Sequence, residues 1–271
     1  MRTVPAPDML RTVPVRRVEV DGARIAYREL GAGQPLLLVM GYAGTMDVWD
    51  PVLVDRLSRR YRVILFDNRG MGQSGPWSGS LSMELMARDA LAVLDALDAR
   101  GAHVLGWSMG GMIAQEMALR EPDKVGKLVL YGPTPSYAAT VRSAVDRMMT
   151  CSPEDFAGLL FPGAWVESHP GVFARLPVPE RAADPDVVAA QKRAMEQWPG
   201  TKDRLSFLCK DVLLVVGDED WVTPPSLGLR MAANLPGAWM VRFRQGGHWL
   251  MYQEPERLAD TVRFFLETKE Q

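Results

Sequence analysis

Apolar residues along the chain fall into short, almost unbroken runs that are separated by longer stretches with helical spacing. The runs lie at residues 36–40, 62–66, 103–105, 127–131, 212–216 and 239–243. Strands that are covered on both faces of a sheet have this composition. Two more stretches, 15–20 and 24–29, flank Asp21-Gly22, a pair that favours the tight turn of a hairpin.

Helical spacing of apolar residues occurs between these runs, at 48–59, 83–99, 109–120, 226–235 and 255–268. Pro224 and Pro225 precede the fourth of these stretches and Gly101 follows the second, which agrees with the residues that begin and end helices. Strands and helices that alternate at this length predict an α/β domain, with a mostly parallel central sheet and helices on both faces.

Residues 133–209 interrupt this alternation. They contain nine of the chain's 20 prolines, no convincing strand, and three stretches with helical spacing at 137–150, 153–160 and 186–198. One interpretation is a long irregular connection, but structureless loops of this length are uncommon in compact domains. We favour a small helical cap, inserted after the sixth strand into a core formed by residues 1–132 and 210–271.

Composition disfavours several classes of protein. The 271 residues are 47% apolar, which is enough for a large core, and a net charge of −2 gives no nucleic-acid-binding surface. The two cysteines, Cys151 and Cys209, lack the spacing of metal ligands or of a disulfide framework. Residues 1–17 lack the apolar region of a secretory signal, and no apolar run is long enough to span a bilayer. We therefore expect a cytoplasmic protein that binds neither nucleic acid nor membrane.

The stretch Gly106-Trp107-Ser108-Met109-Gly110 places a serine between two glycines, where a predicted strand gives way to a predicted helix. Side chains at the two glycine positions would strike the neighbouring strand and helix, and this pattern is known as the nucleophile elbow. The serine then lies at a helix N-terminus, where free N–H groups and the helix dipole stabilise negative charge. Acyl transfer develops such a charge, so Ser108 is the candidate nucleophile.

A serine nucleophile needs a base, and the chain has three histidines. His103 begins the strand that leads to Ser108 and would lie about 16 Å from it, at the wrong end of the sheet. His169 lies within residues 133–209, where we expect a solvent-facing loop. His248 follows the last predicted strand, directly after two glycines, and is the candidate base.

The candidate acid lies among three carboxylates, Asp218, Glu219 and Asp220, which follow the strand predicted at 212–216. A catalytic carboxylate orients the imidazole and stabilises its charged form. We expect Asp220 in this position, because the spacing Gly217-x-x-Asp220 lets the chain leave the strand before it turns inward. Asp218 is the alternative, since strand boundaries can shift by two residues.

With Ser108, Asp220 and His248 in this order, the sequence resembles the α/β-hydrolase superfamily over nearly its whole length, in particular capped serine hydrolases of the esterase or lactonase type. The stretch "FDNRGMGQSGP", residues 66–76, is similar to a glycine-rich loop that is mainly structural in that superfamily.

The resemblance implies an oxyanion hole made by the backbone N–H groups of Met109 and Tyr42. Met40 stands where the superfamily usually has a histidine. The mechanism implied is acyl transfer from Ser108 to water, with no metal and no organic cofactor.

Four large apolar residues are candidate substrate contacts, since ligand sites are mostly apolar. Trp107 and Trp249 adjoin the candidate nucleophile and base, whereas Phe161 and Trp165 belong to residues 133–209. We expect a small-molecule substrate, a carboxylic ester or lactone of medium size and apolar character. Hydrolysis of a carbon–carbon bond in a diketone, cofactor-free perhydrolase chemistry and non-enzymatic ligand sensing are the alternatives, and the protein is expected to be a monomer or homodimer.

Overall fold

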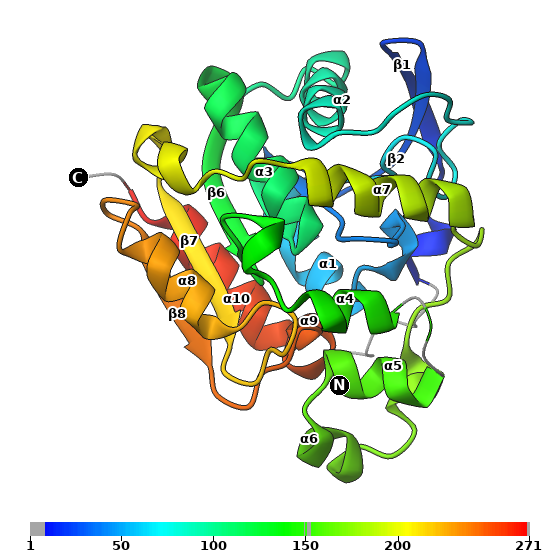
Figure 1. The fold of residues 1–271 in the computed structure, drawn as a ribbon. Coiled ribbons are helices and arrows are strands. Elements are labelled where there is room, and N and C mark those ends of the chain that lie inside the picture. Colours follow the sequence, from blue (N-terminus) through cyan, green and yellow to red (C-terminus); the bar gives the residue numbers. More distant parts are fainter. Residues whose placement is uncertain (1–8, 149, 151–152, 270–271) are drawn as a thin grey trace.

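A central sheet of eight strands carries the fold, in the order β1-β2-β4-β3-β5-β6-β7-β8 (Figure 1). The computed structural model describes residues 9–148, 150 and 153–269. Its strands are β1 (Arg16–Val20), β2 (Ala23–Leu30), β3 (Gln34–Val39), β4 (Tyr61–Phe66), β5 (Ala102–Trp107), β6 (Val125–Tyr131), β7 (Val212–Gly217) and β8 (Trp239–Phe243). Only β2 runs against its neighbours, β1 and β4, and all other pairs are parallel, so the prediction of a mostly parallel sheet is confirmed.

Two elements differ from the prediction for local reasons. The strand predicted at 103–105 continues to Trp107, because Gly106 and Trp107 still pair with β6. The helix predicted at 48–59 instead comprises a 3-10 turn, Met46–Val48, followed by α1 (Pro51–Ser58). The residue before a proline disfavours helical backbone, and Asp50 accordingly stays extended and accepts hydrogen bonds from the N–H groups of Val52 and Leu53.

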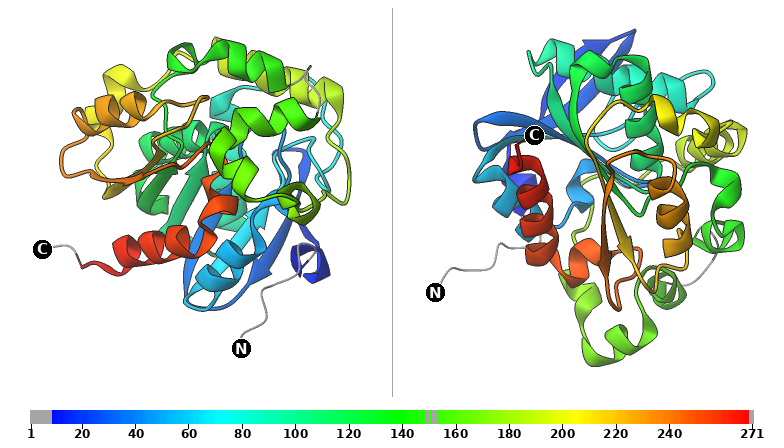
Figure 2. Two further views of the ribbon diagram at one scale, coloured as in Figure 1. Left: turned by 90° about the horizontal axis from the view of Figure 1, so that it is seen from below. Right: turned by 90° about the vertical axis from the view of Figure 1, so that its left-hand side faces the viewer.

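Helices cover both faces of the sheet and enclose one apolar core on each side (Figure 2). One face carries α2 (Met83–Ala96), α3 (Met109–Arg120) and α8 (Pro225–Ala232), and the other carries α1, α10 (Pro255–Glu267) and the short α9 (Leu250–Gln253). Two further 3-10 turns lie at Met9–Thr12 and Pro122–Lys124. None of the helices within the described residues is long and apolar enough to cross a membrane.

Residues 133–209, called the insert from here on, separate β6 from β7. Its described part contains no strand; its elements are 3-10 turns at Tyr137–Ala139, Val172–Arg175 and Lys202–Phe207 and the helices α4 (Arg142–Met148), α5 (Pro153–Leu160), α6 (Gly163–Ser168) and α7 (Pro185–Gln197). The helix predicted at 137–150 is broken where the Val141 N–H bonds to the Val222 carbonyl. Met149 and Cys151 lie outside the described residues.

Parallel strands end at one edge of the sheet, and the candidate site residues follow these ends. Ser108 comes directly after β5, Asp220 comes three residues after β7, and His248 comes five residues after β8. Ligands of open α/β sheets bind beyond this edge. The insert is attached over the same edge, for instance by the Trp249 N–H, which donates to the Leu160 carbonyl at 2.9 Å.

The turn around Ser108 makes a stability prediction. A Cβ at Gly110 would lie 2.0 Å from the Val39 carbonyl oxygen, whereas a Cβ at Gly111 would lie 3.3 Å from its nearest atom, the Gly106 oxygen. Backbone cannot move aside as a side chain can, so we expect Gly110→Ala to lower the free energy of unfolding by about 3 kcal/mol or more, the upper end of overpacking effects. Thermal unfolding should show Tm falling by roughly 6–12 °C.

Gly111→Ala is the matched control for Gly110→Ala and should shift Tm far less, because alanine also favours helix. Equal shifts for the two variants would contradict this account of the turn.

Candidate active site

Ser108 lies in a strained turn between β5 and α3. Its φ of +54° is in the left-handed region, which costs a non-glycine residue on the order of 1–3 kcal/mol. Its N–H donates to the Tyr131 carbonyl at 2.9 Å, and its own carbonyl accepts from the Gly111 N–H at 2.8 Å. A Cβ at Gly106 would lie 2.4 Å from the Gly110 oxygen, so both flanking glycines are sterically required. The turn thus holds the serine hydroxyl at the end of the strand.

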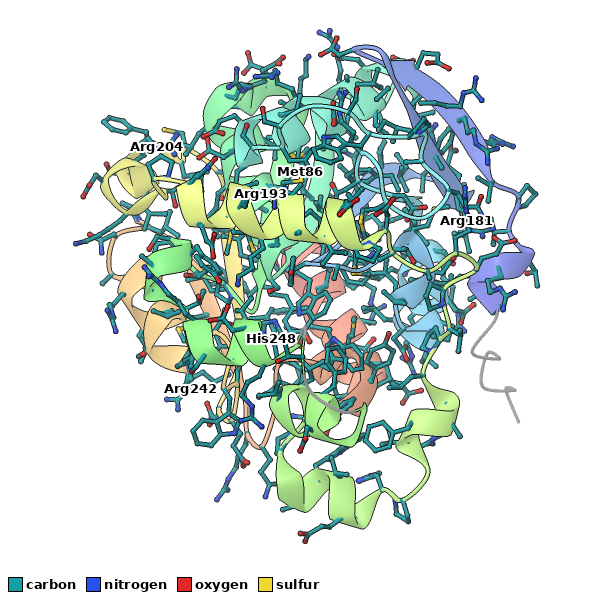
Figure 3. The ribbon with its side chains drawn as sticks, turned by 45° about the vertical axis from the view of Figure 1, so that its right-hand side comes forward. Met86, Arg181, Arg193, Arg204, Arg242 and His248 are labelled. Atoms are coloured by element: carbon teal, nitrogen blue, oxygen red, sulfur yellow. The ribbon has the colours of Figure 1, made fainter. Side chains whose placement is uncertain are left out.

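His248 is buried, and Figure 3 marks its position in the fold. Its Nε2 lies 3.0 Å from the Ser108 Oγ. The backbone of His248 is held as well, because its carbonyl accepts from the Trp107 indole N–H at 3.1 Å and from the Tyr131 hydroxyl at 2.6 Å. Two buried donors on one carbonyl fix the loop that carries the imidazole, and no local pattern in the sequence indicates this role for Tyr131.

Asp220 completes a hydrogen-bonded chain. Its Oδ2 lies 2.8 Å from His248 Nδ1 and also accepts from the Thr223 hydroxyl at 2.9 Å. Its Oδ1 accepts from the N–H groups of Val222 and Thr223, each at 2.8 Å. A carboxylate can only accept, so Nδ1 carries the hydrogen and Nε2 is left to accept from Ser108.

The other acidic and histidine candidates lie apart from the hydrogen bonds that join Ser108, His248 and Asp220. Asp218 pairs with Arg242 Nε at 2.9 Å near the surface. His103 accepts from the Lys127 N–H at 3.0 Å, beside a register shift between β5 and β6. Burial, together with the charge of Lys127, lowers the pKa of His103 to about 4. His169 is exposed and its ring stacks on Trp165, with 4.3 Å between the ring centres.

The loop after β3 faces the start of α3. It makes a four-residue turn in which the Gly44 N–H donates to the Gly41 carbonyl at 3.2 Å, and Ala43 has a φ of +59°. Glycine or asparagine normally fills a turn position with positive φ. The Ala43 N–H donates to Oε1 of Gln191 at 3.0 Å. The N–H groups of Tyr42 and Met109 donate to no group within the described part of the chain.

A cavity of about 270 Å³ opens on Ser108 and His248. Its walls are mostly apolar, and eight of the lining residues belong to the insert: Tyr137, Thr140, Val145, Phe156, Leu160, Pro177, Pro179 and Met195. Trp107 and Trp249, two of the candidate substrate contacts, line it. Tyr42 also lines it, and burial of its phenol raises the pKa of Tyr42 to about 12.

Two of the candidate substrate contacts lie outside the cavity wall. Phe161 and Trp165 are not among the residues that line the cavity. The Phe161 ring stands edge-on to Trp249, with 5.5 Å between ring centres, and Trp165 stacks on Phe161 at 4.9 Å. Two aromatic residues of the insert do line the cavity, Tyr137 and Phe156, and the Phe156 ring stands edge-on to Trp249 at 5.6 Å.

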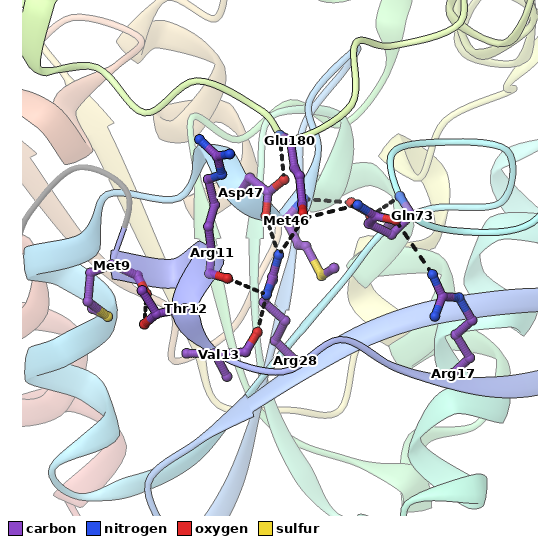
Figure 4. Close-up of polar contacts among 11 residues, drawn as sticks. Met9, Arg11, Thr12, Val13, Arg17, Arg28, Met46, Asp47, Gln73 and Glu180 are labelled. Atoms are coloured by element: carbon purple, nitrogen blue, oxygen red, sulfur yellow. Dashed lines mark hydrogen bonds and ion pairs between the residues drawn. The ribbon is translucent and has the colours of Figure 1, made fainter.

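A buried arginine, Arg28, joins the insert to the core beside the loop that follows β3 (Figure 4). The Arg28 guanidinium lies 3.1 Å from Asp47 and 3.2 Å from Glu180 of the insert. It also donates to the carbonyls of Arg11 and Val13. The Glu180 N–H donates to the second Asp47 oxygen at 2.9 Å, so Asp47 is held by both the side chain of Arg28 and the backbone of the insert.

The loop of residues 66–76 hydrogen-bonds to the 3-10 turn at Met46–Val48, in keeping with the structural role that the resemblance implied. Asp67 is buried and accepts from the N–H groups of Met46 and Gln73, each at 2.7 Å. Burial raises the pKa of Asp67 to about 7, although the two backbone donors oppose this shift.

A serine held in a sharp strand–helix turn, at the carboxyl edge of a mostly parallel sheet, is the arrangement found in α/β hydrolases. Among the described residues, no three His, Cys, Asp or Glu side chains gather as metal ligands would. The sequence model of the alpha/beta hydrolase fold matches residues 34–255, so the chain belongs to this family.

Individual relatives agree. The "Putative carbamate hydrolase RutD" of Azorhizobium caulinodans is 30% identical over 236 residues, which cover 83% of this chain and 88% of that protein. An alpha/beta hydrolase fold protein from Chitinophaga pinensis has a TM-score of 0.86 at 28% identity, covering 98% and 100% of the two chains. A thermophilic esterase from Thermogutta terrifontis has a TM-score of 0.81 at 27% identity, covering 93% and 98%.

The two aspartates allow a direct test. Asp220→Asn keeps the shape but removes the charge that fixes the imidazole tautomer, so we expect kcat/KM for an activated ester to fall by about 10⁴-fold. Asp218→Asn breaks only a surface ion pair, which contributes about 0.2–1 kcal/mol, and should change kcat/KM by less than about threefold. A larger loss of kcat/KM in Asp218→Asn than in Asp220→Asn would instead identify Asp218 as the acid.

The cavity wall makes a second prediction. Phe156→Ala should enlarge the cavity and raise the ratio of kcat/KM for p-nitrophenyl hexanoate over acetate by about tenfold, since one methylene in an apolar pocket is worth roughly 1–3 kcal/mol. Trp165→Ala, which removes an aromatic ring of the same insert outside the cavity, should leave the ratio within about twofold. If Trp165→Ala shifts the ratio and Phe156→Ala does not, our assignment of the cavity wall is wrong.

Proposed function

We propose that the protein is a serine hydrolase that cleaves a carboxylic ester or lactone of a medium-sized, apolar small molecule through an acyl-enzyme. The observation that carries this proposal is the continuous chain from Ser108 Oγ to His248 Nε2 at 3.0 Å and from His248 Nδ1 to Asp220 at 2.8 Å, opening on an apolar cavity. Such a chain activates a hydroxyl that is otherwise a poor nucleophile.

In the first step, His248 takes the proton of the Ser108 hydroxyl while Oγ bonds to the substrate carbonyl carbon. The carbonyl electrons move to oxygen and form an oxyanion. When they return, the carbon–oxygen bond to the alcohol breaks, and the His248 proton goes to the leaving alcohol. In the second step, water gives its proton to His248, attacks the acyl-enzyme, and releases the acid as Ser108 regains the proton.

The oxyanion is held by the N–H groups of Met109 and Tyr42. Both are without a partner in the residues that the structure describes, and Met109 begins α3. The helix dipole adds to the attraction at this end of α3. Donors fixed in advance in a site of low polarity are worth more than the same donors in water.

The insert acts as a cap over a core of residues 1–132 and 210–271. Support comes from the eight insert residues that line the cavity and from the bonds that join insert to core. An apolar wall favours an apolar acyl or alcohol group over a small polar carbamate. The similarity to the Thermogutta terrifontis esterase, at 27% identity, points to the same class of bond.

The decisive experiment replaces the nucleophile. Ser108→Ala should lower kcat/KM for p-nitrophenyl esters by about 10⁴-fold or more. It should also abolish labelling by a fluorophosphonate, which bonds to an activated serine. Tm should change little, because only one oxygen is removed.

Substrate panels separate the alternatives. Wild-type protein should turn over esters or lactones faster than carbamates and diketones. Labelling of Ser108 with turnover of diketones alone would replace the ester assignment, and retention of most ester turnover by pure Ser108→Ala would remove Ser108 as the nucleophile.

A further inference from the structure

Gln191 lies in the middle of α7, in the insert, yet none of its surface is exposed. Its neighbours on the buried face of the helix are apolar: Val187, Val188, Ala190, Ala194 and Met195. A buried carboxamide must be stripped of water, so its presence needs a polar partner. The described residues offer one such partner, the Ala43 N–H, 3.0 Å from Gln191 Oε1.

Ala43 is the residue that most needs support in its turn. Its φ of +59° is unfavourable for an alanine, and it is joined directly to Tyr42. A turn that relaxed to negative φ at Ala43 would rotate the peptide between the two residues. Because Gln191 accepts from the N–H of this peptide, it opposes the rotation.

The neighbouring contacts hold the same loop from other sides. A Cβ at Gly41 would lie 2.8 Å from the ring of Trp107, so the start of the turn is pressed against the residue before Ser108. Four residues after Ala43, Asp47 accepts from the Glu180 N–H of the insert at 2.9 Å (Figure 4). The peptide at Ala43 is therefore the part of the turn that depends on α7.

We propose that Gln191 is a positioning residue for the reaction: its amide oxygen holds the peptide between Tyr42 and Ala43 and thereby keeps the whole turn in the shape in which the Tyr42 N–H, which belongs to the preceding peptide, points at the oxyanion. The inference rests on the proposed function, since it assigns a donor of the oxyanion hole. It makes the insert part of the catalytic apparatus as well as the wall of the cavity, because the core turn reaches its working shape with α7 in place.

The test uses Gln191→Met, which keeps the length of the side chain and removes the acceptor. We expect kcat for p-nitrophenyl esters to fall about 10- to 100-fold with KM nearly unchanged, because full removal of an oxyanion donor costs about 10²- to 10³-fold. A trifluoromethyl ketone bonds to Ser108 and places its own oxyanion in the hole, so its Ki should rise by the same factor. The Ki of the matching alcohol, which forms no oxyanion, should stay within about twofold.

Two variants separate positioning from stability. Trp198→Phe removes another bond between the end of α7 and the core, the 2.7 Å bond from the Trp198 indole to Glu116, and should lower Tm without changing kcat. Ala43→Gly allows positive φ without strain, so adding Gln191→Met to it should reduce kcat by less than about threefold. If Trp198→Phe lowers kcat as much as Gln191→Met does, or Gln191→Met lowers only Tm, the inference is wrong.

Failure of the Gln191 inference can be distinguished from failure of the proposed function. Loss of activity in Ser108→Ala with unchanged kinetics in Gln191→Met overturns this inference alone, whereas an active Ser108→Ala overturns both. If Gln191→Met does not fold, Gln191→Asn, which is one methylene too short to reach the loop, takes its place. Hydrogen exchange of the Ala43 amide should be slow in the wild-type protein and faster in Gln191→Asn; fast exchange in the wild-type protein would contradict the bond.

Discussion

The first turn of α3 and the end of β3 approach so closely that no side chain fits between them. A Cβ at Gly110 would overlap the Val39 carbonyl, and the helix cannot move away, because its residues from Met109 to Ala118 are all buried. This one contact forces Ser108 into its left-handed conformation and sets the start of α3 beside the loop that contains Tyr42. The proposed nucleophile and both proposed oxyanion donors thus owe their arrangement to backbone packing.

Loops supply the remaining groups, and these loops are fixed through their main chains. The carbonyl of His248 has two buried donors, and the Asp220 carboxylate closes its own turn by binding the N–H groups of Val222 and Thr223. Each bond of this kind contributes only about 0.5–1.5 kcal/mol to stability. Their value for a site is geometric, since they leave the imidazole little freedom to turn away from Ser108.

Local signals account for what the sequence predicted. Glycines two residues on either side of Ser108 mark a strand–helix turn, and Asp220 follows its strand at a distance that the short turn dictates. The mostly parallel sheet followed from the apolar runs. These features depend on neighbours in the chain, so they can be read without knowing the packing.

Features that depend on how the insert packs were harder to predict from the sequence. Phe156, Phe161 and Trp165 look alike in sequence, and only the way that α5 and α6 fold over Trp249 decides which ring reaches the cavity. Gln191 carries no local signal at all, because a glutamine in the middle of a helix usually faces solvent. Its partner Ala43 lies 148 residues away along the chain.

Separation along the chain also governs when the site can exist during synthesis. The Ser108 hydroxyl and the His248 ring are 140 residues apart, and β7 and β8 must join the sheet before they can meet. A nascent chain that has emerged only as far as β6 contains the complete serine turn but neither Asp220 nor His248. The Ser108 hydroxyl of such a chain lacks the base of the proposed mechanism, so we expect a polypeptide that ends at β6 to be inert toward the esters of its surroundings.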